Sequence, residues 1–262
     1  MEAVWRGLDV ASKREESTMK QMVLALALVM LAGGPANAES PASGSTGIGV
    51  KDYPWQALPG EQNEALERQG DRKRGEKLYA LCRSCHLPSA AGRSDGSMPQ
   101  LAGQHGSVLI KQMADIRSGL RHNPTMYPFA TVLSDPQDLA DLAAHLERLC
   151  IPAEHGQYEA ADAVEQVANG RVLYEKACRE CHGSRGEGSR HQLYPVLAGQ
   201  HFRYLLQQMT TIRDGQRRNA HPEMVKLISQ YDDDQLLAIA AYQSSLRMPG
   251  KMCRVRAPAK KP

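Results

Sequence analysis

Apolar residues recur along the chain at helical spacing, and no stretch alternates apolar and polar residues as a surface strand would. The clearest apolar stripe consists of Leu139, Leu142, Ala143, Leu146 and Leu149. A counterpart towards the C-terminal end consists of Leu236, Ile239, Ala240 and Leu246. Ser134 and Gln137 predict a capping box where the first stripe begins. The pattern therefore predicts an all-α fold.

Each half of the chain is expected to form three helices. The expected segments are 75–85, 107–118 and one starting near Ser134 in the first half, and 169–181, 202–214 and the C-terminal stripe in the second half. Gly119 and Gly215 follow the second helices and suit the left-handed residue that ends a helix. Between the second and third helices, each half has a proline-containing loop with one methionine.

The two halves are a tandem duplication. The cluster Cys82-Arg83-Ser84-Cys85-His86 recurs 96 positions later as Cys178-Arg179-Glu180-Cys181-His182. Leu101-Ala102-Gly103-Gln104-His105 recurs at the same offset, as Leu197-Ala198-Gly199-Gln200-His201. Further matches pair Pro99 with Pro195, Met113 with Met209, Gly119 with Gly215, and Arg121 with Arg217. The repeat predicts two domains, 71–155 and 156–250, with a loosely structured lead-in over 39–70 and a tail over 251–262.

Composition adds a constraint on the cores of these domains. Only 5% of the 262 residues are aromatic, which is a small share for two ordinary hydrophobic cores. A large apolar cofactor in each domain would supply the missing core volume. The net charge of +3 is small, and basic and acidic residues alternate without a basic stripe. Nucleic acid is therefore not an expected partner.

The N-terminal region has the pattern of a signal peptide. A short apolar run over 22–31 follows Lys20 and precedes Ala36-Asn37-Ala38, which predicts cleavage after Ala38. Residues 1–18 do not resemble the start of such a peptide, so Met19 is a candidate start. We expect a soluble periplasmic protein, although a signal segment retained as an anchor stays an alternative.

The cysteine clusters indicate covalent haem. Two cysteines three positions apart can bond the two vinyl groups of one porphyrin, and the adjacent histidine can bind its iron. The predicted attachment residues are Cys82, Cys85, Cys178 and Cys181, with His86 and His182 as iron ligands. Zinc would need ligands shared between the clusters, and a thioredoxin-like disulfide would need a βαβ unit. Two covalently attached haem c groups are therefore expected.

Met126 and Met224 are the candidate sixth ligands of the two irons, 40 and 42 residues after His86 and His182. A thioether is a soft ligand that favours Fe(II) and suits electron transfer. Met113 and Met209 also recur, but within predicted helices, and are expected to fill the core. His105 and His201 recur at helix starts, where we expect surface or capping groups.

The duplicated order of CxxCH, Pro-x-Leu-Ala-Gly-Gln, Arg-x-Gly-x-Arg and a loop methionine resembles the cytochrome c4 family over about 71–248. The resemblance implies two cytochrome c folds related by a pseudo-two-fold axis, with haem propionates near the domain interface. It also implies that Pro99 and Pro195 carbonyls accept the Nδ1–H of His86 and His182. The chain departs from the family pattern after the first cluster, which is followed by Leu87-Pro88, whereas the second cluster is followed by the more usual Gly183. It departs again at His145, where an aromatic residue is more usual and the second repeat has Tyr242.

The two remaining cysteines, Cys150 and Cys253, leave three alternatives open. In an oxidising compartment they could form a disulfide that ties the tail to the end of the first domain. Two free thiols and an intermolecular bridge are the other two alternatives.

The expected function is a diffusible electron carrier, not an enzyme, which takes electrons from a quinol-oxidising complex and delivers them to a terminal oxidase. Its partners would be redox proteins, including membrane complexes contacted peripherally, with no small-molecule substrate. The alternatives are a cytochrome subunit of a periplasmic dehydrogenase, such as a sulfide-oxidising flavoprotein, and a dihaem peroxidase or thiosulfate-oxidising enzyme. An enzyme would need an open sixth position at one haem, which two equivalent methionine loops disfavour.

Overall fold

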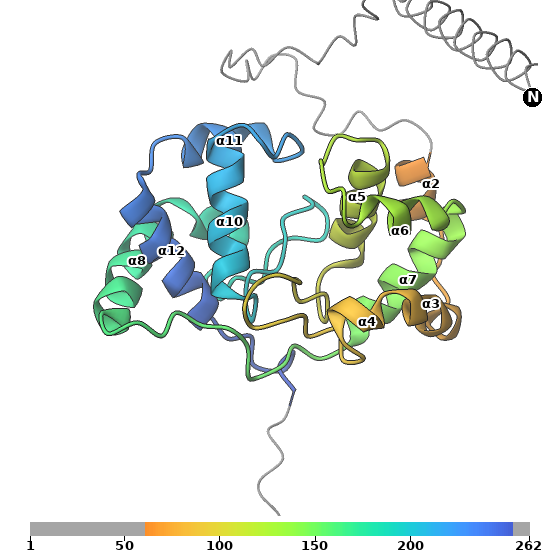
Figure 1. Cartoon of the computed structure of the whole chain (residues 1–262), viewed down its shortest axis with the longest axis horizontal. Coiled ribbons are helices and arrows are strands. Elements are labelled where there is room, and N and C mark those ends of the chain that lie inside the picture. Colours follow the sequence, from red (N-terminus) through yellow and green to blue (C-terminus); the bar gives the residue numbers. More distant parts are fainter. Residues whose placement is uncertain (1–60, 254–262) are drawn as a thin grey trace, which may run out of the picture. The chain divides into compact units, whose positions relative to one another are not determined.

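The computed structural model describes residues 61–253 of the chain (Figure 1). The predicted signal segment, the lead-in over 39–60 and the end of the tail lie outside these residues. No helix within 61–253 is long and apolar enough to cross a membrane.

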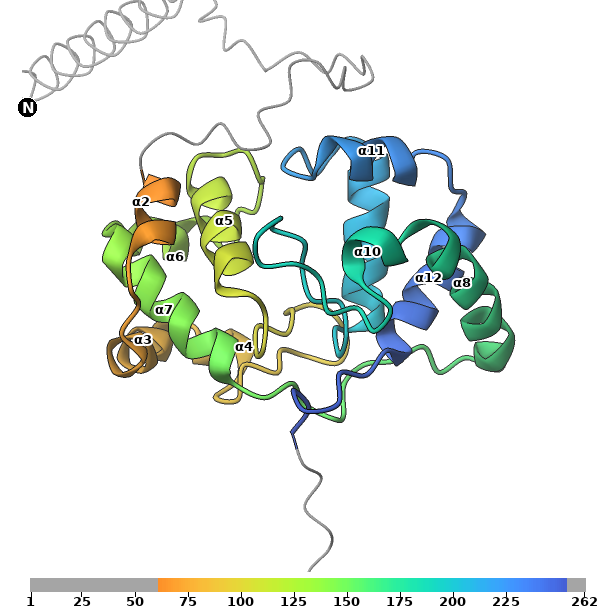
Figure 2. The ribbon, with the colours of Figure 1, turned by 180° about the vertical axis from the view of Figure 1, so that it is seen from behind.

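The described residues form helices in two successive groups, which Figures 1 and 2 show from opposite sides. Domain 1 holds α2 Glu61–Glu67, α3 Arg72–Leu78, the 3-10 turn η2 Tyr79–Leu81, α4 Arg83–His86, α5 Gly106–Arg117, α6 Tyr127–Val132 and α7 Pro136–Arg148. Domain 2 holds α8 Ala163–Ala177, α9 Arg179–His182, α10 Phe202–Arg213, α11 Pro222–Ile228 and α12 Asp233–Ser245. Only isolated β-bridges occur in this part of the chain, so the predicted all-α fold is confirmed.

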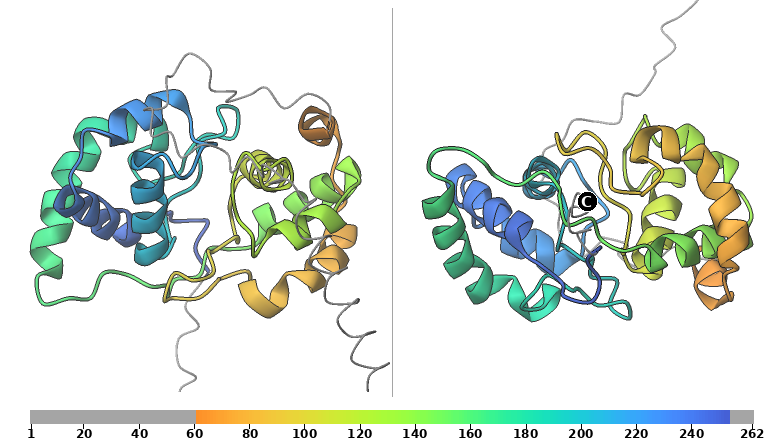
Figure 3. Two further views of the ribbon diagram at one scale, coloured as in Figure 1. Left: turned by 45° about the horizontal axis from the view of Figure 1, so that its top comes forward. Right: turned by 90° about the horizontal axis from the view of Figure 1, so that it is seen from below.

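In each domain the helix that precedes the CxxCH cluster crosses the last helix at a glycine. A Cβ atom on Gly75 of α3 would lie 2.0 Å from the backbone oxygen of Asp141 in α7, and one on Gly170 of α8 would lie 1.8 Å from that of Ala238 in α12. Only glycine allows so close an approach of two helix backbones. The crossing of α8 and α12 is visible in both views of Figure 3.

Aromatic pairs pack beside these crossings. The ring centroids of Tyr79 and His145 are 5.7 Å apart, and those of Tyr174 and Tyr242 are 5.3 Å apart. His145 therefore faces the core of its own domain. Each domain has its own hydrophobic cluster, with Met209 buried in one and Met113 packed against the other. The expectation that these two methionines fill the core is confirmed.

Two local expectations were wrong. Helix α7 is capped by Asp135, whose carboxylate accepts from the N–H of Gln137 (2.8 Å), and not by Ser134. Pro136 explains the difference, because proline fits the first helical position and so places the cap directly before it. A capping box does occur at the start of the equivalent helix α12, between Asp232 and Gln235.

The end of the predicted loose lead-in is also ordered. Residues 61–67 form helix α2, which packs against α5 and α7. Its Ala65 is 1% exposed, because a small apolar side chain at that position fits into the core of domain 1.

The described end of the tail is fastened where the two domains join. Cys150 and Cys253 form a disulfide, so the intramolecular bond is the alternative that the structure contains. Ile151 donates its N–H to Lys251 (2.8 Å) and accepts from the N–H of Cys253 (2.7 Å). Its fully buried side chain also lies against Gly103 and Gly199, the equivalent glycines of the two repeats.

Candidate functional site

The two CxxCH clusters occupy equivalent short helical turns. Cys82 and Cys178 directly precede α4 and α9, and each accepts a hydrogen bond from the backbone N–H of its cluster histidine, at 2.9 Å in both domains. The two cysteines of a cluster are therefore one turn apart. None of the four cluster cysteines forms a disulfide, and no group of three or more His, Cys, Asp or Glu side chains within 61–253 is arranged to hold a metal ion.

The cluster histidines are buried and hydrogen-bonded through Nδ1. The Nδ1 atom of His86 lies 2.9 Å from the carbonyl oxygen of Pro99, and that of His182 lies 3.4 Å from the carbonyl oxygen of Pro195. Burial lowers the pKa of both imidazoles, and the proline carbonyls oppose this shift. Nε2 of His86 is buried and has no hydrogen-bond partner. A neutral imidazole with a fixed Nδ1–H and a buried, unpartnered Nε2 suits an iron ligand.

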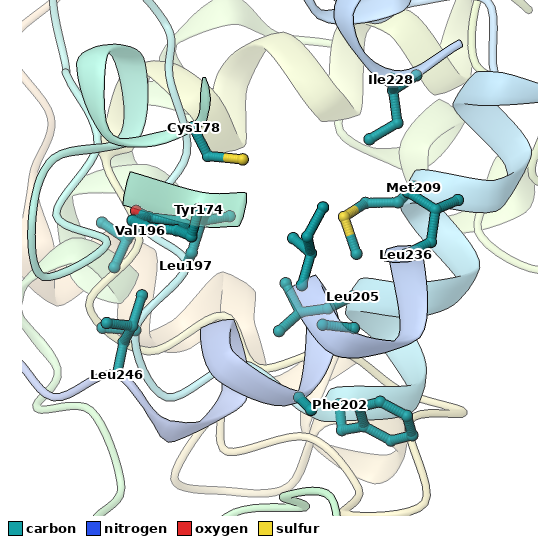
Figure 4. Packing of buried hydrophobic residues seen from close by; sticks show 14 of the residues in the cluster. Tyr174, Cys178, Val196, Leu197, Phe202, Leu205, Met209, Ile228, Leu236 and Leu246 are labelled. Atoms are coloured by element: carbon teal, nitrogen blue, oxygen red, sulfur yellow. The ribbon is translucent and has the colours of Figure 1, made fainter. Parts of the chain in front are cut away.

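A cavity of about 810 Å³ is lined from both domains. Most of the candidate haem residues contribute to it: Cys82, His86, Met126, Cys178, Cys181, His182 and Met224. Cys85 is not among the lining residues. Figure 4 shows part of the domain 2 wall, where the sulfur atoms of Cys178 and Met209 point towards the same space. The cavity lining there also includes the apolar side chains of Val196, Leu197 and Leu205, and an apolar lining suits a porphyrin.

Both candidate methionines lie next to or within short helices, so the predicted loops are partly wrong. Met126 directly precedes α6, and its N–H donates to Asn123 Oδ1 (3.0 Å). Met224 lies inside α11, which His221 caps by accepting from the N–H of Glu223 (3.1 Å). Both helices have a proline in their first turn, a position where proline is favoured.

The glutamines of the repeated Leu-Ala-Gly-Gln-His segment join the domains. Gln104 accepts from the backbone N–H of Val196 (2.8 Å) and donates to its carbonyl (3.0 Å). Gln200 accepts from the N–H of Gln100 (3.0 Å) and donates to its carbonyl (3.0 Å). Because Gln100 and Val196 are 96 positions apart, these contacts are equivalent in the two repeats.

The adjacent histidines also cross between the domains, which corrects the expectation of surface or capping groups. Nε2 of His105 lies 2.8 Å from the carbonyl oxygen of Glu187, and Nε2 of His201 lies 2.8 Å from that of Ala91. Neither side chain caps its helix. His201 is only 2% exposed, because domain 1 covers it. The repeated segment is thus an interdomain contact.

The repeated arginines form a polar bridge in the cavity wall. Arg121 donates to Gln112 (2.9 Å), Gln208 (3.2 Å) and Tyr204 (2.9 Å). Arg217 donates to the same two glutamines, at 3.0 Å and 2.8 Å. Two guanidinium groups from different domains therefore lie close together on the cavity lining.

Comparison with known proteins assigns the family. A family model described as "Cytochrome c" matches residues 72–149, and one described as "Cytochrome C oxidase, cbb3-type, subunit III" matches residues 165–242. The chain is 31% identical to "Cytochrome c4" of Azotobacter vinelandii over 189 residues, which are 68% of this chain and 90% of that protein. The chain belongs to the cytochrome c4 family.

Two further similarities agree with this assignment. The chain is 34% identical over 208 residues to "Thiosulfate dehydrogenase electron acceptor" of Stutzerimonas stutzeri, covering 74% of this chain and 95% of that protein. The crystal structure of reduced cytochrome c4 from Pseudomonas stutzeri matches with a TM-score of 0.60 and 26% identity, covering 68% of this chain and all of that one. The predicted pair of cytochrome c domains is confirmed.

Members of this family are dihaem electron carriers, so this chain carries two covalently attached haem c groups. The residues present fit the cofactor, because the buried and unpartnered Nε2 of His86 belongs to a histidine on the cavity wall.

Proposed function

We propose that this protein is a periplasmic electron shuttle in which His86 with Met126, and His182 with Met224, hold the two haem irons. Cys82, Cys85, Cys178 and Cys181 would form the thioether bonds. The observation that carries the proposal is that all four iron-ligand candidates line one cavity, into whose wall the unpartnered Nε2 of His86 is buried. The bound haems supply one-electron chemistry by alternating between Fe(II) and Fe(III).

The chain's own residues would tune and hold these haems. The thioethers of Met126 and Met224 favour Fe(II) and thereby raise the potentials. The carbonyls of Pro99 and Pro195 orient the proximal imidazoles. Arg121 and Arg217 place positive charge on the cavity lining, where it would stabilise haem propionates.

For the partners, we favour a quinol-oxidising complex as donor and a terminal oxidase as acceptor. With both irons saturated by His and Met, the protein would exchange electrons through the haem edges and would need no substrate-binding site. The Ala36-Asn37-Ala38 cleavage signal supports a periplasmic location.

A second donor is supported by one of the comparisons. The relative from Stutzerimonas stutzeri is described as the electron acceptor of a thiosulfate dehydrogenase. A dehydrogenase is therefore the alternative source of electrons, with this chain as its acceptor.

The donor can be identified by rapid mixing of the oxidised holoprotein with each candidate. We expect the quinol-oxidising complex, supplied with quinol, to reduce both haems faster than a thiosulfate dehydrogenase supplied with thiosulfate. Each donor without its substrate is the control. Faster reduction by the thiosulfate dehydrogenase would reverse the order of the two candidates.

A further inference from the structure

One peptide group in domain 1 connects the cluster histidine to a side chain of domain 2. The carbonyl of Pro99 accepts the Nδ1–H of His86 at 2.9 Å. The N–H of the same peptide group, contributed by Gln100, donates to Oε1 of Gln200 at 3.0 Å. A hydrogen-bonded path therefore runs from Gln200 through a single peptide plane to His86.

The same path exists in domain 2, with the roles of the domains exchanged. The carbonyl of Pro195 lies 3.4 Å from Nδ1 of His182, and the N–H of the following residue, Val196, donates to Oε1 of Gln104 at 2.8 Å. Each cluster histidine is thus linked to a glutamine of the other domain.

The orientation of both glutamine amides is fixed by the backbone that they contact. Each Oε1 meets an N–H and each Nε2 meets a carbonyl of the same residue, so a flipped amide would lose both hydrogen bonds. Gln200 is only 6% exposed, so water does not easily replace its contacts. The side-chain carbonyl oxygen of each glutamine is therefore held against a peptide N–H of the other domain.

The peptide group transmits polarisation, because its carbonyl and N–H belong to one conjugated system. Accepting a hydrogen bond from the N–H increases electron density on the carbonyl oxygen, and linked hydrogen bonds strengthen one another. A stronger acceptor at Nδ1–H makes the imidazole a better donor to iron, which favours Fe(III).

We propose that Gln104 and Gln200 are positioning residues that each adjust the haem potential of the other domain, through the peptide group behind that domain's cluster histidine. The inference rests on the proposed ligand roles of His86 and His182. It makes the domain interface part of the environment of both irons. The effect should be larger on the domain 1 haem, because its Nδ1 to carbonyl distance is shorter.

The test uses the holoprotein with Gln200→Met and Gln104→Met, which keep the side-chain length and remove the amide. The potential of each haem is followed by an NMR redox titration with haem methyl signals assigned to each domain. We expect Gln200→Met to raise the potential of the domain 1 haem and Gln104→Met to raise that of the domain 2 haem. In the reduced state, the Nδ1–H signal of the affected histidine should move upfield.

Gln100→Met is the matched control, because the side chain of Gln100 donates within its own domain, to Ala102, while its backbone makes the proposed contact. We expect this variant to leave the Nδ1–H signal of His86 in place. A change that appears at both haems equally, or in the mutated domain only, would overturn the proposal, as would no change at either haem.

Gln200→Glu removes the donor and replaces the amide oxygen with a carboxylate, which is a stronger acceptor for the Gln100 N–H. This variant also covers the case in which Gln200→Met fails to fold. We expect the His86 Nδ1–H signal to move downfield in this variant, opposite to Gln200→Met. Shifts in the same direction would contradict the proposal. Failure of the ligand assignment itself is distinguishable, because the wild-type optical spectrum would then lack the signature of His/Met haem.

Discussion

Helices α5 and α10 occupy equivalent places in the two domains, but they carry different polar side chains. On α5, Lys111 and Asp115 form an ion pair with exposures of 2% and 0%, and Asn219 of domain 2 donates to Asp115 (2.6 Å). The equivalent residues on α10 are Gln207 and Thr211, which are uncharged. The duplicated scaffold thus repeats the candidate haem residues and the residues that join the domains, while charge at the interface differs between the copies.

A second difference lies directly after the clusters. Leu87 and Gly183 have φ angles of +66° and +77°, and their carbonyls accept from Tyr79 and Tyr174 at 2.7 Å. The backbone turns in the same way in both domains, although only domain 2 uses the residue that favours this turn. Domain 1 therefore carries backbone strain that domain 2 avoids.

The largest expected effect comes from breaking the ion pair of domain 1. Asp115→Asn leaves the Lys111 charge buried, which should lower the free energy of unfolding by about 3–5 kcal/mol. The double variant Lys111→Gln with Asp115→Thr gives α5 the residues of α10 and should be much less destabilising. Chemical denaturation of the holoproteins measures both. An equal loss in the two variants would show that the charge itself is not the cause.

Removing the disulfide should have the next largest effect on the free energy of unfolding, and this effect should be common to both domains. Cys150 and Cys253 are 103 positions apart, so removing their bond frees a long loop in the unfolded chain. We expect the Cys150→Ser and Cys253→Ser double variant to lose about 2–4 kcal/mol of unfolding free energy. Denaturation with and without a reductant measures the loss. If reduction destabilises the double variant as much as the wild type, the disulfide is not responsible.

The strained turn gives a smaller effect with opposite signs in the two domains. Leu87→Gly should stabilise domain 1, because it relieves a strain on the order of 1–3 kcal/mol. Gly183→Ala should destabilise domain 2, because alanine is strained at the φ angle of +77° that Gly183 adopts. Thermal unfolding checks both variants, with the exposed Ser89→Gly as control. Destabilisation by Leu87→Gly would contradict the strain.

The smallest expected effect is a pH dependence of the interdomain contacts. Burial lowers the pKa of His201 in the folded protein. As the pH falls below the ordinary histidine value of about 6.5, the unfolded chain therefore binds a proton that the folded protein does not, and the free energy of unfolding decreases. Burial alone would raise the pKa of Glu147, but hydrogen bonds from His105 and Arg190 lower it to about 2. The ionised carboxylate therefore contributes to the free energy of unfolding, and this contribution is lost as the pH falls from about 4.5 towards 2.

Each of these two pH windows has its own variant. His201→Gln should flatten the decline of unfolding free energy below pH 6.5, and Glu147→Gln should flatten only the decline below about 4.5. Denaturant titrations over a pH series measure both slopes. A slope that is unchanged in His201→Gln would assign the upper window to other buried histidines, such as His155.

The sequence predicted the longer helices and the candidate haem residues because the signals for both are local or repeated, whereas the short helices α2, α6 and α11 were expected to be loops or loosely structured. Apolar spacing located α5, α7, α10 and α12, and the duplicated clusters located the candidate attachment residues of two haems. It did not predict the roles of Gln104 and His105, because their partners Val196 and Glu187 come from the other repeat and only folding brings them close. The available signal was that both polar residues recur unchanged in the repeated Leu-Ala-Gly-Gln-His segment.

We propose that each domain holds one haem iron between its cluster histidine and its methionine. Optical spectra of the oxidised and reduced holoprotein, with haem counted per chain, test it most directly in the wild type, Met126→Ala and Met224→Ala. We expect two haems per chain and a far-red charge-transfer band that each substitution reduces by about half. A wild type in which one haem lacks this band, or binds carbon monoxide readily when reduced, would contradict paired His/Met ligation.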